Sequence, residues 1–242
     1  METDGSTADD EATFEELLPI VRRALESGGH LDLMGLASAT LAIVVHPAEP
    51  AAESDGGDQD RAIEHVVRRA VDHGSPESLA YAAAMAALVP PGALQTRLRD
   101  GLDGAAHELP RWLAEIDRTR VEAPTIVRDL FDDDEWLLAG IRFSDDDRAS
   151  FRVSIDHGAD GAVVDAALMH QSVDEVRQQL RASAAEDEVT IADMLPGELA
   201  ARYGEAAAMG DTLEPTRTDT WPSSRPLVDW LFRLAPGDDP GR

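Results

Sequence analysis

The spacing of apolar residues changes its period near residue 119, and this change constrains the fold more than any other feature. Before that point apolar residues recur every three or four positions, as Phe14, Leu17 and Val21 do on one helical face. After it apolar and polar residues alternate, as in FRVSID at 151–156. The two periods predict an α+β protein, with an N-terminal helical bundle of αα-hairpins followed by an antiparallel β-meander with C-terminal helices.

Each predicted helical hairpin joins an amphipathic helix to an almost wholly apolar one. VRRALESGG at 21–29 and VRRAVDHG at 67–74 lie 46 residues apart, and each ends an amphipathic helix at a glycine turn. Apolar stretches at 33–45 and 79–89 follow them. A period of this length is typical of HEAT and armadillo arrays. Stable arrays usually contain three or more units, so we prefer a bundle of repeated hairpins to a true solenoid.

The second half is predicted to begin with four strands. The hairpin loops between them have the composition of SDDDRAS at 144–150 and DHGADG at 156–161. The predicted strands cover 120–131, 135–143, 151–156 and 162–170, and the helices after them cover 172–184 and 196–209. The predicted organisation is a disordered acidic segment over 1–12, a helical region over 13–118, a sheet region with C-terminal helices over 119–236 and a flexible tail over 237–242.

Composition excludes several classes of function. The formal net charge is −27 and both halves of the chain carry it, so phosphate backbones and anionic lipid surfaces are disfavoured as partners. All 21 basic residues are arginine and there is no cysteine, which excludes Schiff-base chemistry, Walker-type phosphate loops and thiolate nucleophiles. No cofactor is predicted. The acidic N-terminus does not resemble a signal peptide, so a cytoplasmic location is predicted.

Two arginines of the meander form the best small-ligand candidate. Arg142 and Arg152 are expected on the outward face of successive strands, with Asp165 on the next. These side chains would form cross-strand ion pairs on the open side of a sheet. In a strongly acidic chain, two arginines would also make a positive site that can hold a carboxylate or phosphate group.

The segment RTDTWPSSRPLVDWLF at 217–232 supports both a structural and a binding interpretation. Pro222 and Pro226 predict a rigid lead-in to a final helix, with Trp221 extended because it precedes a proline. Trp221 and Arg225 are the candidates for a partner site, since large rings and arginines dominate protein interfaces. Fastening of the last helix is the preferred interpretation.

Acid-rich loops provide the alternative catalytic or metal candidates. Two acid-rich segments can meet at one end of the meander: FDDDEW at 131–136 and SDDDRA at 144–149. Paired carboxylates there can share a proton or hold Mg²⁺. Asp156, His157 and Asp160 occupy the loop DHGADG. Solvated turns are the simpler interpretation, because adjacent aspartates are frequent in this chain.

HLDLMGLASATLA at 30–42 and TDTWPSSRPLVDWLFRL at 218–234 resemble segments of a family of uncharacterised proteins from high-GC actinobacteria. The resemblance follows the same order along most of the chain. It implies a helix-then-sheet layout and brings no catalytic motif. The predicted function is therefore non-enzymatic: a cytoplasmic binding or regulatory protein with a protein partner. The alternative is a hydrolase or ligand-binding enzyme that uses the acid-rich loops.

Overall fold

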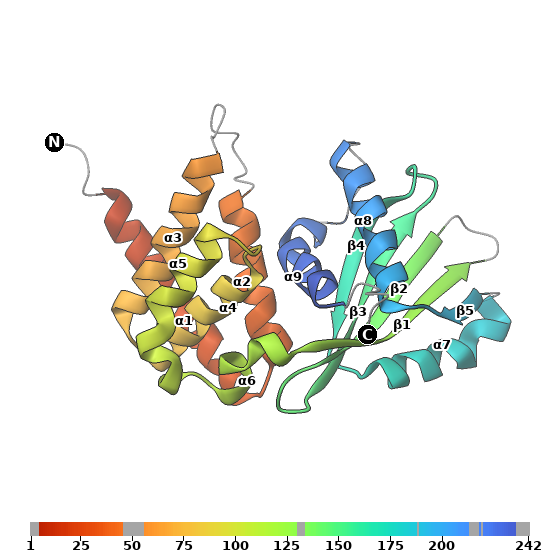
Figure 1. The fold of residues 1–242 in the computed structure, drawn as a ribbon, viewed down its shortest axis with the longest axis horizontal. Coiled ribbons are helices and arrows are strands. Elements are labelled where there is room, and N and C mark those ends of the chain that lie inside the picture. The colour runs from red at the N-terminus through yellow and green to blue at the C-terminus, as the bar shows by residue number, and fades with distance from the viewer. Residues whose placement is uncertain are drawn as a thin grey trace, which may run out of the picture. The chain divides into compact units, whose positions relative to one another are not determined.

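The computed structural model describes residues 5–45, 56–129, 134–187, 189–212, 218 and 220–235. The chain forms two compact units, residues 1–114 and 115–242. The first is helical, and the second contains a five-stranded antiparallel sheet and C-terminal helices, which confirms the predicted α+β class (Figure 1). The first helix already begins at Gly5, inside the segment predicted to be disordered. Residues 1–4 and the predicted tail at 237–242 lie outside the described residues.

In the helical unit, amphipathic outer helices surround two apolar ones. The apolar helices are α2 and α4, and every residue of α4 from Ser78 to Leu88 is buried. Ser75 caps α4, because its Oγ accepts a hydrogen bond of 3.2 Å from the backbone N–H of Ser78. The helices are α1 (Gly5–Glu26), α2 (His30–Val45), α3 (Gly56–His73), α4 (Pro76–Leu88), α5 (Ala93–Leu102) and α6 (Arg111–Ala114), with a 3₁₀ helix at Asp103–Glu108.

The two helical hairpins turn at equivalent glycines. Gly28 follows α1 with φ of 67° and Gly74 follows α3 with φ of 71°. Both values lie in the left-handed region, which glycine enters without the clash that a Cβ causes. The two glycines are 46 residues apart, so the sequence repeat coincides with a repeated backbone turn.

The sheet is a four-stranded meander with one additional strand. Its order is β4-β3-β2-β1-β5, and all neighbours are antiparallel. The segment 189–193, which was not predicted as a strand, pairs with β1 at one edge; it has five residues and two of its side chains are half-buried. At the other edge, the backbone N–H of Thr218 donates to the carbonyl of Val164 at 3.1 Å. The strands are β1 (Arg120–Asp129), β2 (Asp134–Arg142), β3 (Arg148–Asp156), β4 (Ala162–Met169) and β5 (Val189–Asp193).

Helices cover both faces of this sheet. On one face, α7 (Val173–Asp187) packs through Val173 and Val176 against Leu138 of β2. On the other face lie α8 (Pro196–Thr212) and α9 (Trp221–Leu234), where the ring of Phe232 meets that of Phe151 on β3 (Figure 1). Because side chains alternate along a strand, even-numbered residues of β2 face α7 and odd-numbered ones face α8 and α9.

Gly140 of β2 lies close to Val173 at the start of α7. A Cβ on Gly140 would stand 2.8 Å from Cγ1 of Val173 and 3.0 Å from Cγ of Glu122. Gly140→Ala is therefore expected to lower the free energy of unfolding by about 1–3 kcal/mol through overpacking, measured by urea denaturation. Gly204→Ala is the control, because nothing lies within 4 Å of the added Cβ in α8. The control should raise stability by about 0.5–1 kcal/mol, and equal effects of the two changes would contradict the prediction.

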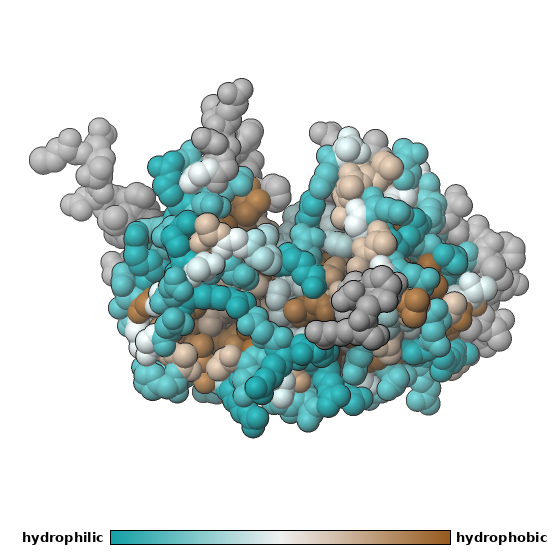
Figure 2. All heavy atoms as spheres, in the orientation of Figure 1, coloured by the Kyte–Doolittle hydropathy of each residue, from teal (hydrophilic) through white to brown (hydrophobic). Residues whose placement is uncertain are grey.

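Hydrophilic residues predominate on the visible surface of both units in Figure 2, in keeping with the net charge of −27. Within the described ranges, no helix combines the length and the apolar character required to cross a bilayer.

Candidate functional site

Three arginines stand side by side across the sheet. Arg120 of β1 is directly opposite Arg142 of β2, and Arg142 is directly opposite Arg148 of β3. Opposed residues of antiparallel strands have Cβ atoms about 4.5–5.5 Å apart and project from the same face. Like charges in such positions destabilise a sheet. We call these three residues the arginine row.

A pocket of about 330 Å³ opens beside the arginine row. Arg120 and Arg142 line it, together with Arg118, which precedes β1. The remaining lining residues are Glu122, Phe143, Ser144 and Asp146. The pocket lies entirely within the sheet unit, where β1 begins and where the β2–β3 hairpin turns. It therefore combines several guanidinium groups with one aromatic side chain.

The three arginines of the row contact different kinds of group. Arg142 donates from Nε and Nη2 to one oxygen of Asp146, at 2.9 and 2.5 Å, and this contact raises the pKa of the guanidinium. Arg148 lies 3.9 Å from a carboxylate oxygen of Glu122. Arg120 donates to two backbone carbonyls, those of Asp117 and Thr119, at 3.1 and 2.9 Å. A carboxylate thus already occupies Arg142, whereas Arg120 donates to backbone carbonyl oxygens.

The predicted partner of Arg142 lies elsewhere. Arg152 follows Arg148 by four residues on β3, roughly 13 Å along the strand. Its guanidinium carbon stands 4.9 Å from the centre of the Trp136 ring. Asp165 of β4 instead accepts hydrogen bonds from the hydroxyls of Thr218 and Thr220. The structure therefore places Arg142 with Arg120 and Arg148 and separates it from Arg152.

A second charged group surrounds Glu135 on the opposite face of the sheet. The Glu135 side chain is 2% exposed and accepts hydrogen bonds from Arg128 Nε at 3.0 Å and Arg202 Nε at 2.6 Å. Burial by itself raises the pKa of this carboxyl, but the bonds from Arg202 and Arg128 outweigh it and hold the pKa below its usual value. Glu135 is therefore an ionised, doubly paired carboxylate.

His157 joins this group from the loop after β3. Its Nε2 lies 3.3 Å from Nη2 of Arg202 and 3.7 Å from a carboxylate oxygen of Glu135. A guanidinium can only donate, so Nε2 of His157 accepts in that hydrogen bond. The two arginines already occupy the Glu135 carboxylate. This arrangement holds α8 on the sheet and keeps the carboxylate paired with two guanidinium groups.

Asp156 and Asp160 belong to a tight turn. Asp156 accepts the backbone N–H of Ala159 on its side chain at 3.2 Å, and Asp160 has φ of 56°. These contacts belong to the tight turn between β3 and β4, where aspartate tolerates a positive φ. Across the residues described, no three His, Asp or Glu side chains are grouped so that they could hold a metal ion.

The acid-rich loops do not share one end of the sheet, and that prediction is wrong. β2 begins at Asp134 and ends at Arg142, and the hairpin at 143–147 follows its end. A strand of nine residues separates the two segments by roughly 27 Å. Residues 131–133 of FDDDEW lie outside the described residues.

Trp221 and Arg225 both make structural contacts. Trp221 is the first residue of α9 and is 2% exposed, so the prediction of an extended Trp221 is wrong. The helix starts there because the proline at the second position needs no backbone N–H partner. Arg225 forms a bidentate ion pair with Asp211 of α8, with hydrogen bonds of 2.6 and 2.8 Å. This pair raises the pKa of the Arg225 guanidinium.

The comparisons with known proteins identify no relative. No family model, no curated protein and no solved structure matches the chain. The resemblance to actinobacterial proteins stays a prediction, and the site is judged on its geometry alone.

Proposed function

We propose that this chain is a non-enzymatic cytoplasmic binding protein whose sheet unit holds the phosphate or carboxylate group of a small ligand at the arginine row. The observation that carries the proposal is the direct opposition of Arg120, Arg142 and Arg148 on three neighbouring strands. In a chain with 48 acidic and 21 basic residues, three arginines at opposed positions of neighbouring strands concentrate positive charge against the overall trend. An anion between them removes their repulsion.

Asp146 supports this proposal because its carboxylate binds Arg142 as the anionic group of a ligand would. Its carboxylate accepts two N–H groups of Arg142, so the guanidinium is already oriented for an oxyanion. The Asp146 side chain is 74% exposed and belongs to the hairpin loop, where an incoming anion can replace it. Arg120 lies directly opposite and supplies the second guanidinium.

The first test is calorimetric titration of the full chain with inorganic phosphate and with pyrophosphate. Arg142→Gln should weaken binding by roughly tenfold or more, because one charge-assisted hydrogen-bond pair is lost. Asp146→Asn should strengthen binding, because the competing carboxylate becomes neutral. Unchanged affinity in Arg142→Gln would refute the site.

Arg152→Gln is the matched control. It removes one arginine from the same face of the same sheet, away from the pocket. Its affinity for phosphate should equal that of the wild type. An equal loss in Arg142→Gln and Arg152→Gln would mean that only the general charge of the unit matters, and would also contradict the proposal.

A hydrolase at Asp156, His157 and Asp160 is less well supported. The Asp156 side chain is engaged in its own turn, and His157 contacts a carboxylate that two arginines already hold. The proposal of a protein partner does not rest on Trp221, whose ring is buried. Ile43 is 69% exposed and is the residue to vary in a test for such a partner.

A further inference from the structure

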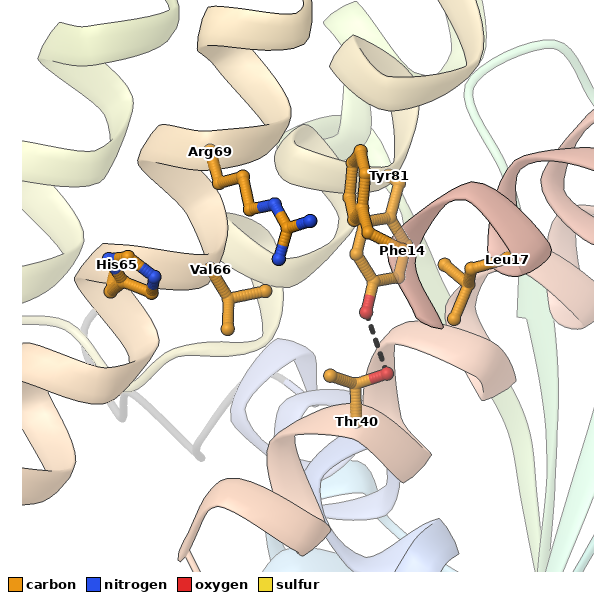
Figure 3. Close-up of a pocket in the computed structure, with 7 residues that line it drawn as sticks. All are labelled: Phe14, Leu17, Thr40, His65, Val66, Arg69 and Tyr81. Carbon is orange, nitrogen blue, oxygen red and sulfur yellow. Dashed lines mark hydrogen bonds between the residues drawn. The ribbon is translucent and has the colours of Figure 1, made fainter. Parts of the chain in front are cut away.

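The helical unit contains a separate pocket of about 240 Å³ that four helices line (Figure 3). The ring of Tyr81, on the buried helix α4, is 1% exposed. Phe14 and Leu17 of α1 approach it from one side, and α3 contributes from the other. The lining is completed by Thr40 of α2 and by His65, Val66 and Arg69 of α3. The pocket therefore has an apolar interior with a few polar groups.

The two hydroxyl groups of this pocket already have partners. Tyr81 donates to Thr40 Oγ1 at 2.6 Å, and Thr40 donates to the carbonyl of Leu36 at 3.1 Å. Burial raises the pKa of Tyr81 to about 12, so the phenol keeps its proton at neutral pH. A bound ligand need not supply a polar group on this side of the pocket.

Arg69 supplies a permanently charged group to the lining of this pocket. Its guanidinium carbon stands 5.2 Å from the centre of the Phe14 ring, and Figure 3 shows the group directed towards Phe14 and Tyr81. Among residues with described side chains, no carboxylate forms an ion pair with it. By contrast, Arg22 and Arg97 of the same unit pair with Glu77 and Glu64. A guanidinium that stacks on a ring keeps its N–H edges available for an oxyanion.

We propose that this pocket binds a small monocarboxylate with one aromatic ring or a similarly sized apolar body. The carboxylate pairs with Arg69, and the apolar body lies against Phe14, Leu17 and the ring of Tyr81. The volume fits this class, since a cavity of about 150 Å³ accommodates benzene and the remainder admits a carboxylate with a methylene group. This pocket belongs to the helical unit, whereas the arginine row belongs to the sheet unit.

The test uses phenylacetate as the probe and the uncharged phenylacetamide as its isostere, each titrated into the full chain and followed by NMR. Phenylacetate should bind, with its signals perturbed by contact with the protein, and phenylacetamide should bind roughly tenfold more weakly. Arg69→Gln should weaken phenylacetate binding by roughly tenfold to a hundredfold and leave phenylacetamide unaffected. Equal affinity for the two probes, or an unchanged affinity in Arg69→Gln, would overturn the proposal.

Three further variants locate the site. Arg68→Gln removes the neighbouring arginine of the same helix, which does not line the pocket, and should bind phenylacetate as the wild type does. Val66→Trp should fill the pocket and abolish binding of both probes, with an unchanged far-UV circular dichroism spectrum as the check on folding. Arg142→Gln should leave phenylacetate binding intact. A loss in Arg142→Gln or Arg68→Gln equal to that in Arg69→Gln would assign the binding to general charge and reject the pocket.

Discussion

Replacing Trp221 with alanine is expected to lower the free energy of unfolding by about 3–5 kcal/mol. The side chain is 2% exposed at the start of α9, so its removal leaves a large cavity in the core of the sheet unit. Urea denaturation of the full chain, followed by far-UV circular dichroism, measures the change. Trp221→Phe should cost clearly less, because most of the buried ring area remains.

A loss below about 1 kcal/mol in Trp221→Ala would contradict the buried position. The expected loss of stability also limits the use of Trp221 variants in binding experiments. A partner lost on mutation of Trp221 would report unfolding of the sheet unit, so binding experiments should vary surface residues such as Ile43 instead.

Glu135→Gln is expected to lower the free energy of unfolding by about 2–3 kcal/mol, because it leaves two arginines without their shared carboxylate. The value is below that of a wholly buried pair, because the side chains of Arg128 and Arg202 are 57% and 30% exposed. Glu205→Gln is the matched control. Glu205 also contacts Arg202, at 3.7 Å, but its side chain is 74% exposed, and the expected loss is at most about 0.5 kcal/mol.

The effect of Glu135→Gln should depend on pH in a defined direction. The folded pKa of Glu135 is lowered, so its ionised form stabilises the protein above the unfolded pKa, which is about 4.3. That contribution is lost as the pH falls through the folded pKa. The stability difference between wild type and Glu135→Gln should therefore be full at neutral pH and shrink in acid. A difference that grew on acidification would contradict the ion-pair interpretation.

The regular elements of this fold could be predicted because their signals are local. Alternation in FRVSID and its neighbouring segments predicts the meander, and glycines after amphipathic stretches predict the turns at Gly28 and Gly74. β5 has no local signal because five residues, none of them buried, give no long alternation, and only its pairing with β1 makes it a strand. Its existence is a tertiary property.

The arginine row depends on the register of strand pairing, which local sequence patterns predict poorly. Arg148 was assigned to the loop SDDDRAS, although β3 begins there and places it opposite Arg142. If both strands of this hairpin are extended to the turn, Arg142 and Arg148 become opposite residues, because the loop length determines the register. The repeated VRRA predicts Arg69 on an amphipathic helix, but its place over the Phe14 ring depends on the packing of the four helices around the pocket.

The two edge strands of the sheet affect whether the protein associates with other copies of itself. An open edge strand can recruit a second chain into a continuous sheet and so begin aggregation. Here one edge strand has five residues and ends at Asp193, which Arg177 of α7 holds, and the other receives the N–H of Thr218 at Val164. Short length, charge and a bonded neighbouring segment are the devices that protect natural sheets. We expect concentrated protein to resist fibril formation, and a change that frees Thr218 from β4 to be the one that weakens this resistance.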